Sequence, residues 1–203
     1  MTPLVIASHN EGKVKEIRAL LAPLGMTVMS AATLNLPEPE ETGSTFAENA
    51  ELKSKNAAML SGHYALSDDS GLCVPALDGA PGIYSARWAG TAKNFSVAIE
   101  RIEHELKAKG VDAQNQPAYF ICVLSLTAPE GDTRVFEGRI DGSLTFPPRG
   151  ADGFGYDPIF IPAGHTQTFS EMEPIVKNAL SHRARAFEKF IAYARTVKPE
   201  ETL

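Results

Sequence analysis

The stretch Leu4–Lys13, with the sequence LVIASHNEGK, decides the fold class of this chain. Its first four residues are apolar, which is typical of a short strand buried on both faces of a sheet. The next five residues form a polar turn. A buried strand followed by a turn and a helix indicates an α/β domain. The helix is expected because apolar residues recur at helical spacing, namely Val14, Ile17, Leu20, Leu21 and Leu24. Gly25 is the expected C-cap of this helix.

The rest of the chain continues this mixed pattern. Further strands are expected over 27–30, 64–67, 119–126, 134–140 and 159–161. Further helices are expected over 45–62 and 95–109, in a short segment after Thr168 with Glu171 as capping partner, and from Ser181 onward. Thr45 and Glu48 have the spacing of a capping box, and 129–132 is typical of a hairpin turn. The sequence therefore predicts helices around a mixed sheet.

The length of 203 residues predicts one domain over 1–203, with two lobes at most. Every apolar run is far shorter than the ~18 residues of a membrane span, and the first residues lack the features of a secretory signal. We therefore expect a cytoplasmic protein without a membrane partner. Cys73 and Cys122 form no CxxC pair, so we expect reduced, buried thiols rather than a disulfide or a zinc site.

The charge of the chain favours a small anionic ligand. Nineteen Lys and Arg against 25 Asp and Glu give a net charge of −6, whereas nucleic-acid-binding proteins are normally basic. Residues 174–203 nevertheless hold six Lys and Arg against three Glu, a local charge of +3. A basic segment in an acidic chain suits a small anion better than a polymer.

The turn after the first strand has features of a phosphate-binding loop. It precedes a helix, where free backbone N–H groups and the helix dipole favour an anion. Ser8 and Asn10 add donors, and Lys13 adds a positive charge. The turn is not a Walker A loop, because Ala7 and Val14 replace the required Gly and Ser or Thr. An ordinary turn with a solvated lysine explains these residues about equally well.

Asp68-Asp69-Ser70-Gly71 follows the apolar strand 64–67. In α/β sheets, ligands bind beyond the carboxyl ends of strands. Two adjacent carboxylates point to opposite faces of an extended chain, so one can hold a hard cation while the other is structural. A solvated Asx turn is the alternative, and for this tetrapeptide alone it is slightly favoured. Ser70 lacks the G-x-S-x-G surroundings of a nucleophile.

Three further groups are candidate ligand contacts. One is a polar stripe on the helix over 45–62, another is an aromatic pair between glycines that suits a flat ligand, and the third is the densest part of the basic segment. The residues are Asn49, Lys53 and Asn56, preceded by Glu40 and Glu41; Phe154, Gly155, Tyr156 and Asp157; and Lys177, His182 and Arg183. A solvated helix face, a core loop, and surface or capping side chains are the respective alternatives.

In combination, these groups closely resemble the inosine triphosphate pyrophosphatase family over residues 5–194. The motifs are S-x-N-x-G-K-x-x-E over 8–16, E-T-G-x-T-F-x-E-N-A over 41–50 with Lys53, D-D-S-G-L over 68–72, G-A-P-G-I-Y-S-A-R over 79–87, F-G-Y-D-P-I-F over 154–160, and Lys177 with S-H-R over 181–183. Two departures are small: His9 stands where many members have Gly, and Trp88 where Tyr is common.

The resemblance implies an elongated mixed-sheet α/β fold with two lobes around a central cleft, and a homodimer. It implies Mg²⁺-dependent hydrolysis of the non-standard purine nucleoside triphosphates ITP, dITP and XTP to the monophosphate and pyrophosphate. The site residues that it implies are Ser8, His9, Asn10, Glu11, Gly12, Lys13 and Lys53 for the triphosphate; Glu41 and Asp69 for the metal, with Asp69 also accepting a proton from the attacking water; Ser70 for a substrate contact; and Phe154, Gly155, Tyr156, Asp157, Lys177, His182 and Arg183 for the base.

Two other functions are weighed against this one. A Maf-type nucleotide pyrophosphatase shares the reaction class but has a phosphate loop of the Ser-x-Ser-Pro-Arg-Arg type, which Ser8–Lys13 does not match. A non-catalytic nucleotide sensor would bind without turnover. The acidic pair beside a phosphate loop argues against the sensor, because a carboxylate there can accept a proton from water.

Overall fold

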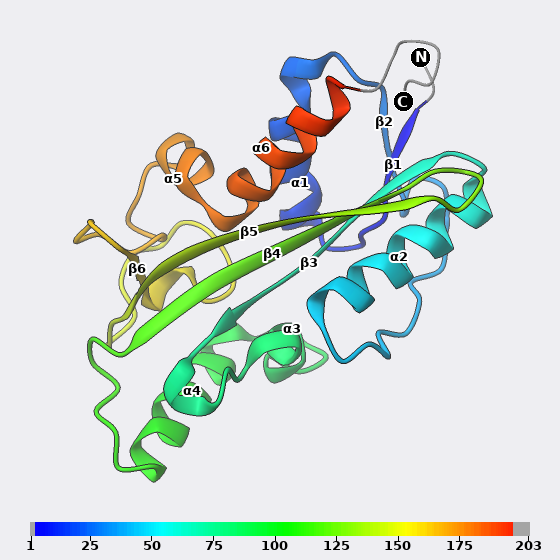
Figure 1. Cartoon of the computed structure of the whole chain (residues 1–203). Coiled ribbons are helices and arrows are strands. Elements are labelled where there is room, and N and C mark those ends of the chain that lie inside the picture. Colours follow the sequence, from blue (N-terminus) through cyan, green and yellow to red (C-terminus); the bar gives the residue numbers. More distant parts are fainter. Residues whose placement is uncertain (1–2, 197–203) are drawn as a thin grey trace. The chain divides into compact units, whose positions relative to one another are not determined.

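The computed structural model describes residues 3–196 (Figure 1). The strands are β1 (Leu4–Ile6), β2 (Val28–Ser30), β3 (Tyr64–Cys73), β4 (Pro117–Thr127), β5 (Thr133–Leu144) and β6 (Phe160–Pro162). The helices are α1 (Glu11–Leu21), α2 (Phe46–Ser61), α3 (Ser85–Trp88), α4 (Phe95–Ala108), α5 (Pro174–Leu180) and α6 (His182–Ala194). The strand order is β2-β1-β3-β4-β5-β6, with β1 parallel to β2 and β3 and β5 antiparallel to β6. The prediction of a mixed-sheet α/β fold is confirmed.

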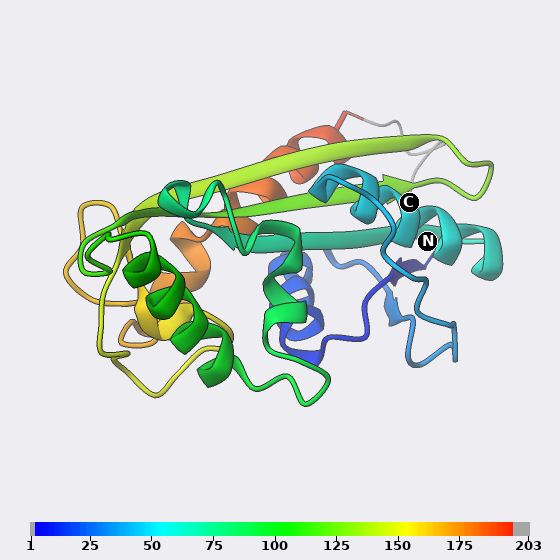
Figure 2. The ribbon, with the colours of Figure 1, turned by 90° about the horizontal axis from the view of Figure 1, so that it is seen from below.

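The chain divides into two compact units. The first comprises Met1–Asp69, Cys122–Gly138 and Arg183–Leu203, and the second comprises Ser70–Ile121 and Arg139–His182. The strands β3, β4 and β5 contribute residues to both units and are neighbours in the sheet (Figure 2). The predicted domain over 1–203 and the basic segment 174–203 both include residues outside the described part. Between residues 3 and 196, every helix is too short or too polar to cross a bilayer.

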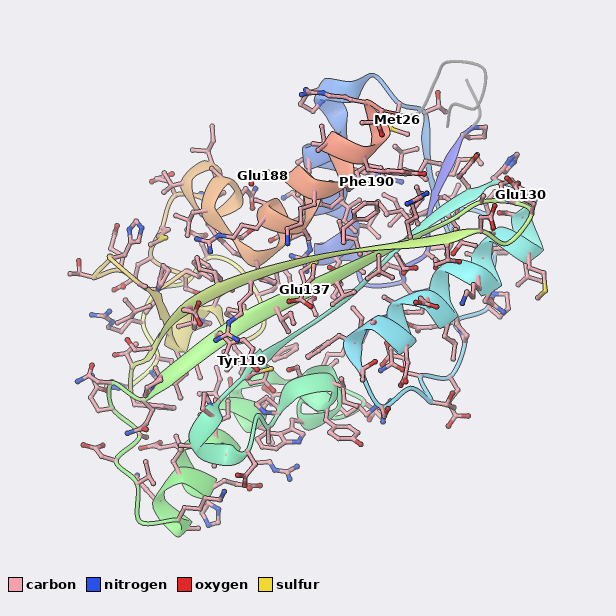
Figure 3. The ribbon with its side chains drawn as sticks, viewed as in Figure 1. Met26, Tyr119, Glu130, Glu137, Glu188 and Phe190 are labelled. Atoms are coloured by element: carbon pink, nitrogen blue, oxygen red, sulfur yellow. The ribbon has the colours of Figure 1, made fainter. Side chains whose placement is uncertain are left out.

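In the first unit, helices cover both faces of the strands (Figure 1). Leu4, Ile6 and Leu66 pack with Ile17 of α1 and with Phe187 and Phe190 of α6. The alternate strand residues Val5 and Ala65 pack with Ala57 and Ala58 of α2. Phe190 is fully buried in this layer, whereas Glu188 on the same helix is exposed (Figure 3). Successive strand residues therefore face different helices, as the two-residue period of a strand requires.

The second unit has its own core, built largely from aromatic side chains. Ile99, Ile102 and Leu106 of α4 belong to it, which confirms the amphipathic helix expected over 95–109. Phe120 makes ring contacts with Phe160 and Phe169, at centroid distances of 4.7 and 5.9 Å. This core fixes the segments that carry the second group of predicted site residues.

Several element boundaries differ from the sequence prediction; for example, the strand expected over 134–140 spans Thr133–Leu144. The first helix ends at Leu21 rather than at Gly25, because Pro23 cannot continue an α-helix and a 3₁₀ turn over 22–24 follows. The strand expected over 64–67 continues to Cys73, so the acidic pair lies inside β3 and not in a solvated turn. The helix expected after Thr168 begins only at Pro174. The predicted bond between Thr168 and Glu171 is present, with Thr168 N–H donating to Glu171 Oε2 at 2.8 Å. It closes a turn and does not cap a helix.

Three other predictions are confirmed. Thr45 and Glu48 form a capping box at the start of α2, and the helix ends at Gly62, whose φ of +66° places it in the left-handed region. A hairpin turn joins β4 and β5, with Ala128 N–H donating to Asp132 O at 2.8 Å and Glu130 at its tip (Figure 3). Cys73 and Cys122 are free, buried thiols, as expected.

We expect Thr45→Ala to lower the free energy of unfolding by about 1 kcal/mol, because Thr45 Oγ1 accepts a hydrogen bond from Glu48 N–H at the first turn of α2. Urea unfolding at neutral pH measures the loss. Thr45→Ser keeps the hydroxyl group and is the matched control, for which we expect a change of less than about 0.5 kcal/mol. Equal stability of the alanine and serine variants would contradict the importance of this cap.

Candidate active site

The predicted site residues are distributed over both units. The first unit contains Ser8–Lys13, Glu41, Lys53, Asp69 and Arg183, and the second contains Ser70, Phe154–Asp157, Lys177 and His182. Within the first unit, β3 organises the charged side chains. Ser67 and Asp69 bond groups of α2, whereas Asp68 bonds groups of α1 and α6. The two carboxylates therefore point to opposite faces of the strand, as the sequence predicts.

On the α2 face, one lysine joins two carboxylates. Lys53 Nζ lies 2.7 Å from Glu41 Oε1 and 2.9 Å from Asp69 Oδ1. Lys53 is only 7% exposed, so the solvated helix face considered from the sequence is wrong for this residue. Asn49, one turn earlier, accepts from Gly43 N–H at 2.8 Å and so ties the segment that carries Glu41 to α2. We call Glu41, Lys53 and Asp69 the acidic triad.

Charge and burial shift the pKa values within the acidic triad. Burial disfavours the charged form of Lys53, but the neighbouring charges of Asp69 and Glu41 outweigh it and raise the pKa of the ammonium group. Burial also raises the pKa of the Asp69 carboxyl, against the opposing effects of Lys53 and Lys13, and the negative charge of Glu41 adds to the rise. Two carboxylates around one ammonium group leave an excess of negative charge, which a divalent cation would neutralise.

The acidic triad fits the chemistry of a magnesium site. Asp69 Oδ2 is buried and has no hydrogen-bond partner within the described part of the chain. Carboxylate oxygens are the ligands that Mg²⁺ prefers, and this ion commonly uses only one or two of them together with substrate phosphates and water. Residues 3–196 contain no group of three His, Cys, Asp or Glu that could hold a metal by themselves. The fit is therefore to an ion shared with substrate, not to a closed structural site.

On the opposite face of β3, Asp68 is fully buried in a network of cations. Its carboxylate lies 2.5 Å from Lys13 Nζ and 3.1 Å from Arg183 Nε, and it accepts from Cys122 Sγ at 2.9 Å. Arg183 also pairs with Glu16. Burial alone would raise the pKa of Asp68, but the charges of Arg183 and Lys13 hold it well below its usual value. This carboxylate is saturated, whereas Asp69 retains an oxygen without a bond.

In the turn over 8–12, the side chains of Ser8 and Asn10, expected as donors to a phosphate, accept hydrogen bonds from the backbone. Asn10 is the N-cap of α1, and its Oδ1 accepts from Lys13 N–H at 3.1 Å. Ser8 Oγ accepts from Asn10 N–H at 3.2 Å, Glu11 is exposed, and Gly12 lies in the first turn of α1. His9 points elsewhere: its Nε2 donates to Leu36 O at 2.9 Å, in the segment that leads to Glu41. The structure thus gives His9 a contact with the protein, and its predicted contact with the triphosphate stays a prediction.

In the second unit, a buried ion pair organises the 154–157 loop. Lys177 Nζ lies 2.7 Å from Asp157 Oδ2 and 4.9 Å from the centre of the Phe154 ring. Asp157 Oδ2 also accepts from Phe154 N–H at 2.8 Å. A side chain at Gly153 would place its Cβ 2.3 Å from the same oxygen, so the loop can wrap this carboxylate only because position 153 is glycine. Three predicted base contacts are therefore brought together.

Tyr156 and His182 are anchored in the core of the second unit. The Tyr156 side chain is 2% exposed, and its hydroxyl group donates to Ser85 O at 2.8 Å. The imidazole of His182 stacks on Phe120 at a centroid distance of 4.8 Å. Gly155 follows Phe154 with a φ of +70°. Ser70 directly follows Asp69 in β3 and is half-buried. These positions are compatible with packing roles, and the predicted substrate contacts stay predictions.

Sequence reasoning predicted that one carboxylate of the Asp68–Asp69 pair is structural, but it missed the anchoring roles of Glu16 and Cys122. Glu16 belongs to the first motif and follows Lys13 by three residues. Its partner Arg183 is 167 residues away from it in the sequence. Arg183 was expected to hold the base; its guanidinium group is 2% exposed and pairs with Asp68 and Glu16. The alternation of β3 was the one available signal, since it requires Asp68 and Asp69 to have different surroundings.

We expect Asp68→Asn to lower the free energy of unfolding at pH 7 by about 3 kcal/mol, because it removes the counter-charge of the buried Arg183 and of the partly buried Lys13. A carboxyl group with a lowered folded-state pKa stabilises the protein above its unfolded pKa of about 3.9, and this stabilisation is lost as the pH falls through the folded-state value. Urea unfolding across the pH range should show the difference between the two proteins shrinking below about pH 4.

The control for this prediction is Asp141→Asn. Asp141 forms an exposed ion pair with Arg139, for which we expect a loss of less than about 1 kcal/mol. A difference between wild type and Asp68→Asn that stayed constant from neutral to acid pH would contradict an electrostatic origin.

Comparison with known proteins agrees with this arrangement. The model of the Ham1 family matches residues 4–193. A dITP/XTP pyrophosphatase of Rhodospirillum centenum is 57% identical, over 93% of this chain and 93% of its own length, and one of Zymomonas mobilis is 53% identical, over 93% and 90%. The solved structure of a HAM1 protein from Coxiella burnetii is 38% identical with a TM-score of 0.88, over 97% of this chain and 100% of that one. The resemblance to the inosine triphosphate pyrophosphatases is thereby confirmed, and the chain belongs to the Ham1 family.

Proposed function

We propose that this chain hydrolyses deaminated purine nucleoside triphosphates, namely dITP, ITP and XTP, to the monophosphate and pyrophosphate. The observation that carries the proposal is its 53–57% identity, across 93% of the chain, to relatives named dITP/XTP pyrophosphatase. The acidic triad supports it, because a buried carboxylate with an unbonded oxygen, held beside a lysine, is suited to phosphate chemistry. The reaction adds the oxygen of water to phosphorus and breaks the bridge between the first and second phosphates.

The triphosphate is assigned to the start of α1 and to two lysines. Backbone N–H groups at a helix N-terminus bind phosphate oxygens, and Asn10 caps this helix. Lys13 contributes a positive charge from the same turn, and Lys53 contributes a second one from the acidic triad. Phosphoryl transfer requires chiefly positioning and charge neutralisation, which these groups provide.

Water activation is assigned to Asp69. Glu41 and Asp69 would hold Mg²⁺, which supplies charge neutralisation at the phosphates and lowers the pKa of bound water. Asp69 accepts the proton that the attacking water loses, through an oxygen that carries no other hydrogen bond. Lys53 fixes the orientation of both carboxylates through its bonds of 2.7 and 2.9 Å.

We assign the base to the residues that the resemblance implies for it, among them Lys177, His182 and Arg183. Lys177 and His182 offer donors, and the 6-oxo group of hypoxanthine and xanthine is an acceptor. Adenine has an amino group at this position, which is a donor. With ATP, the donors of the protein would face a donor of the base, and these hydrogen bonds would not form. The proposal also includes homodimerisation, which is supported by the family resemblance set out from the motifs, and a location in the cytoplasm, as expected from the first residues and the short apolar runs.

The assay that tests this proposal measures pyrophosphate release from dITP with Mg²⁺. We expect turnover by the wild type, its loss in EDTA and its return with added Mg²⁺. Asp69→Asn keeps the shape of the side chain but cannot accept the proton, so we expect kcat to fall by about 100-fold or more while KM changes much less.

Asp141→Asn, which alters an exposed carboxylate, is the matched control and should retain wild-type kcat. A kcat of Asp69→Asn close to that of the wild type would exclude Asp69 as the base. Binding of dITP without pyrophosphate release would identify a sensor, and full activity in EDTA would refute the metal requirement.

For base selection, we expect Arg183→Ala to reduce kcat/KM for ITP and XTP by about tenfold more than for ATP, since unmade hydrogen bonds to the 6-oxo group cost ~1–3 kcal/mol. The measurement compares ITP, XTP, GTP and ATP in the two proteins. An equal fractional loss on all four nucleotides would limit Arg183 to its ion pairs with Asp68 and Glu16.

A further inference from the structure

Three buried hydroxyl groups join α2 to β4 next to Lys53. Ser54 follows Lys53 in α2, Ser125 and Thr127 lie in β4, and none of the three is more than 1% exposed. Ser54 Oγ lies 2.8 Å from Ser125 Oγ and 2.7 Å from Thr127 Oγ1. We call these three residues the hydroxyl cluster.

The hydroxyl cluster has further partners on both sides. Ser54 Oγ lies 3.1 Å from Glu51 O, and Thr127 Oγ1 lies 3.1 Å from Thr133 Oγ1. A hydroxyl group has one proton to donate and two lone pairs that can accept, and either oxygen can be the donor in each bond between hydroxyl groups. Ser54 has three partners, which use its full hydrogen-bonding capacity. Loss of any member of the cluster takes a partner from a buried hydroxyl group, which is unfavourable.

A fourth hydroxyl group attaches the same turn of α2 to β3. Ser67 Oγ donates to Ala50 O at 2.5 Å, and Ser67 is fully buried. Ser67 and Asp69 are two residues apart in β3 and therefore lie on the same face of the strand. One strand thus carries both an anchor for α2 and the carboxylate that Lys53 of α2 must reach.

The buried apolar residues on this face are small. They are Ala57 and Ala58 of α2 with Val5, Ala7 and Ala65, and the partly buried Met29, Leu34 and Leu36 pack against this cluster. Small side chains bury little apolar area and interdigitate weakly, so they oppose sliding or rotation of the helix less than large ones do. Directional hydrogen bonds therefore add to the restraint on where this turn of α2 sits against the strands.

We propose that the hydroxyl cluster positions Lys53. The cluster fixes the position of α2 along its axis and its rotation about that axis, so that Lys53 Nζ reaches both Glu41 and Asp69. This inference rests on the proposed function, in which the acidic triad is the reacting site. Lys53 makes bonds of 2.7 and 2.9 Å to two carboxylates from different segments, and a shift of the helix by about 1 Å would lengthen at least one of them. Ser54, Ser125 and Thr127 are positioning residues, because they act through Lys53.

The test separates the hydroxyl group of Thr127 from its volume. Thr127→Val keeps the shape and removes the hydroxyl group, whereas Thr127→Ser keeps the hydroxyl group and removes a methyl group. We expect Thr127→Val and Ser54→Ala to lower kcat for dITP by about tenfold or more, with a smaller change in KM, since displacement of a reacting group by about 1 Å is costly. We expect Thr127→Ser to stay within about threefold of wild type.

Ser61→Ala is the matched control on the same helix, because Ser61 Oγ donates to Ala57 O and accepts from His63 N–H, and neither of these partners lies in β3 or β4. All variants are assayed well below their melting temperatures. The reverse order, with kcat lowered in Thr127→Ser and kept in Thr127→Val, would assign Thr127 to packing and overturn the proposal. Unchanged kcat in both Thr127→Val and Ser54→Ala would overturn it as well.

Crystal structures of the same variants give a readout that does not depend on activity. We expect the 2.9 Å contact between Lys53 Nζ and Asp69 Oδ1 to be lost in Thr127→Val and kept in Thr127→Ser. An unmoved Lys53 in Thr127→Val would refute the positioning role even if the wild type proved inactive on dITP. An inactive wild type with a displaced Lys53 would refute the proposed function alone.

Discussion

The alternation of side chains along β3 is the constraint on which the first unit depends. Asp68 and Asp69 are adjacent in an extended strand, so their carboxylates must leave it on opposite faces. Both are buried, and a buried carboxylate without a counter-charge is strongly destabilising. Each face must therefore bring a cation to the strand: Lys13 and Arg183 on one side, Lys53 on the other. A shift of one residue in register would exchange the two carboxylates and lose both arrangements.

The carboxylates of Asp68 and Asp69 differ in hydrogen bonding and in pKa because they have different numbers of partners. Asp68 receives two cations and a thiol donor, which together saturate it and hold its pKa low. Asp69 shares one lysine with Glu41 and keeps a free oxygen, while burial raises its pKa. The saturated group suits a structural role, and the unsaturated one suits proton transfer and metal binding. Chemically identical neighbours in sequence thus acquire separate tasks.

The second unit shows the same principle on a smaller scale. Asp157 and Lys177 neutralise each other in a buried pair, and the pair determines the conformation of the loop before it. The ammonium group also lies 4.9 Å from the centre of the Phe154 ring, a cation–π contact that holds this ring beside the ion pair. In both units a lysine holds a carboxylate in place, and the surrounding backbone takes its shape from that ion pair.

The sequence by itself determined the α/β class, the capping box of α2, the hairpin, the family motifs and the opposite faces of the acidic pair, because each follows from local spacing. For Asp68 and Asp69 it left open a ligand site at the end of a strand and a solvated turn; only the tertiary structure supplies the cations that allow both carboxylates to be buried in β3. The same holds for Lys53, which reads as a solvated side chain in the helix pattern. Arg183 meets Glu16 from 167 positions away, and the hydroxyl groups of Ser54 and Ser125 meet from 71 positions away. No local pattern encodes such contacts, because they arise only when β4 and α6 pack beside the elements that carry their partners.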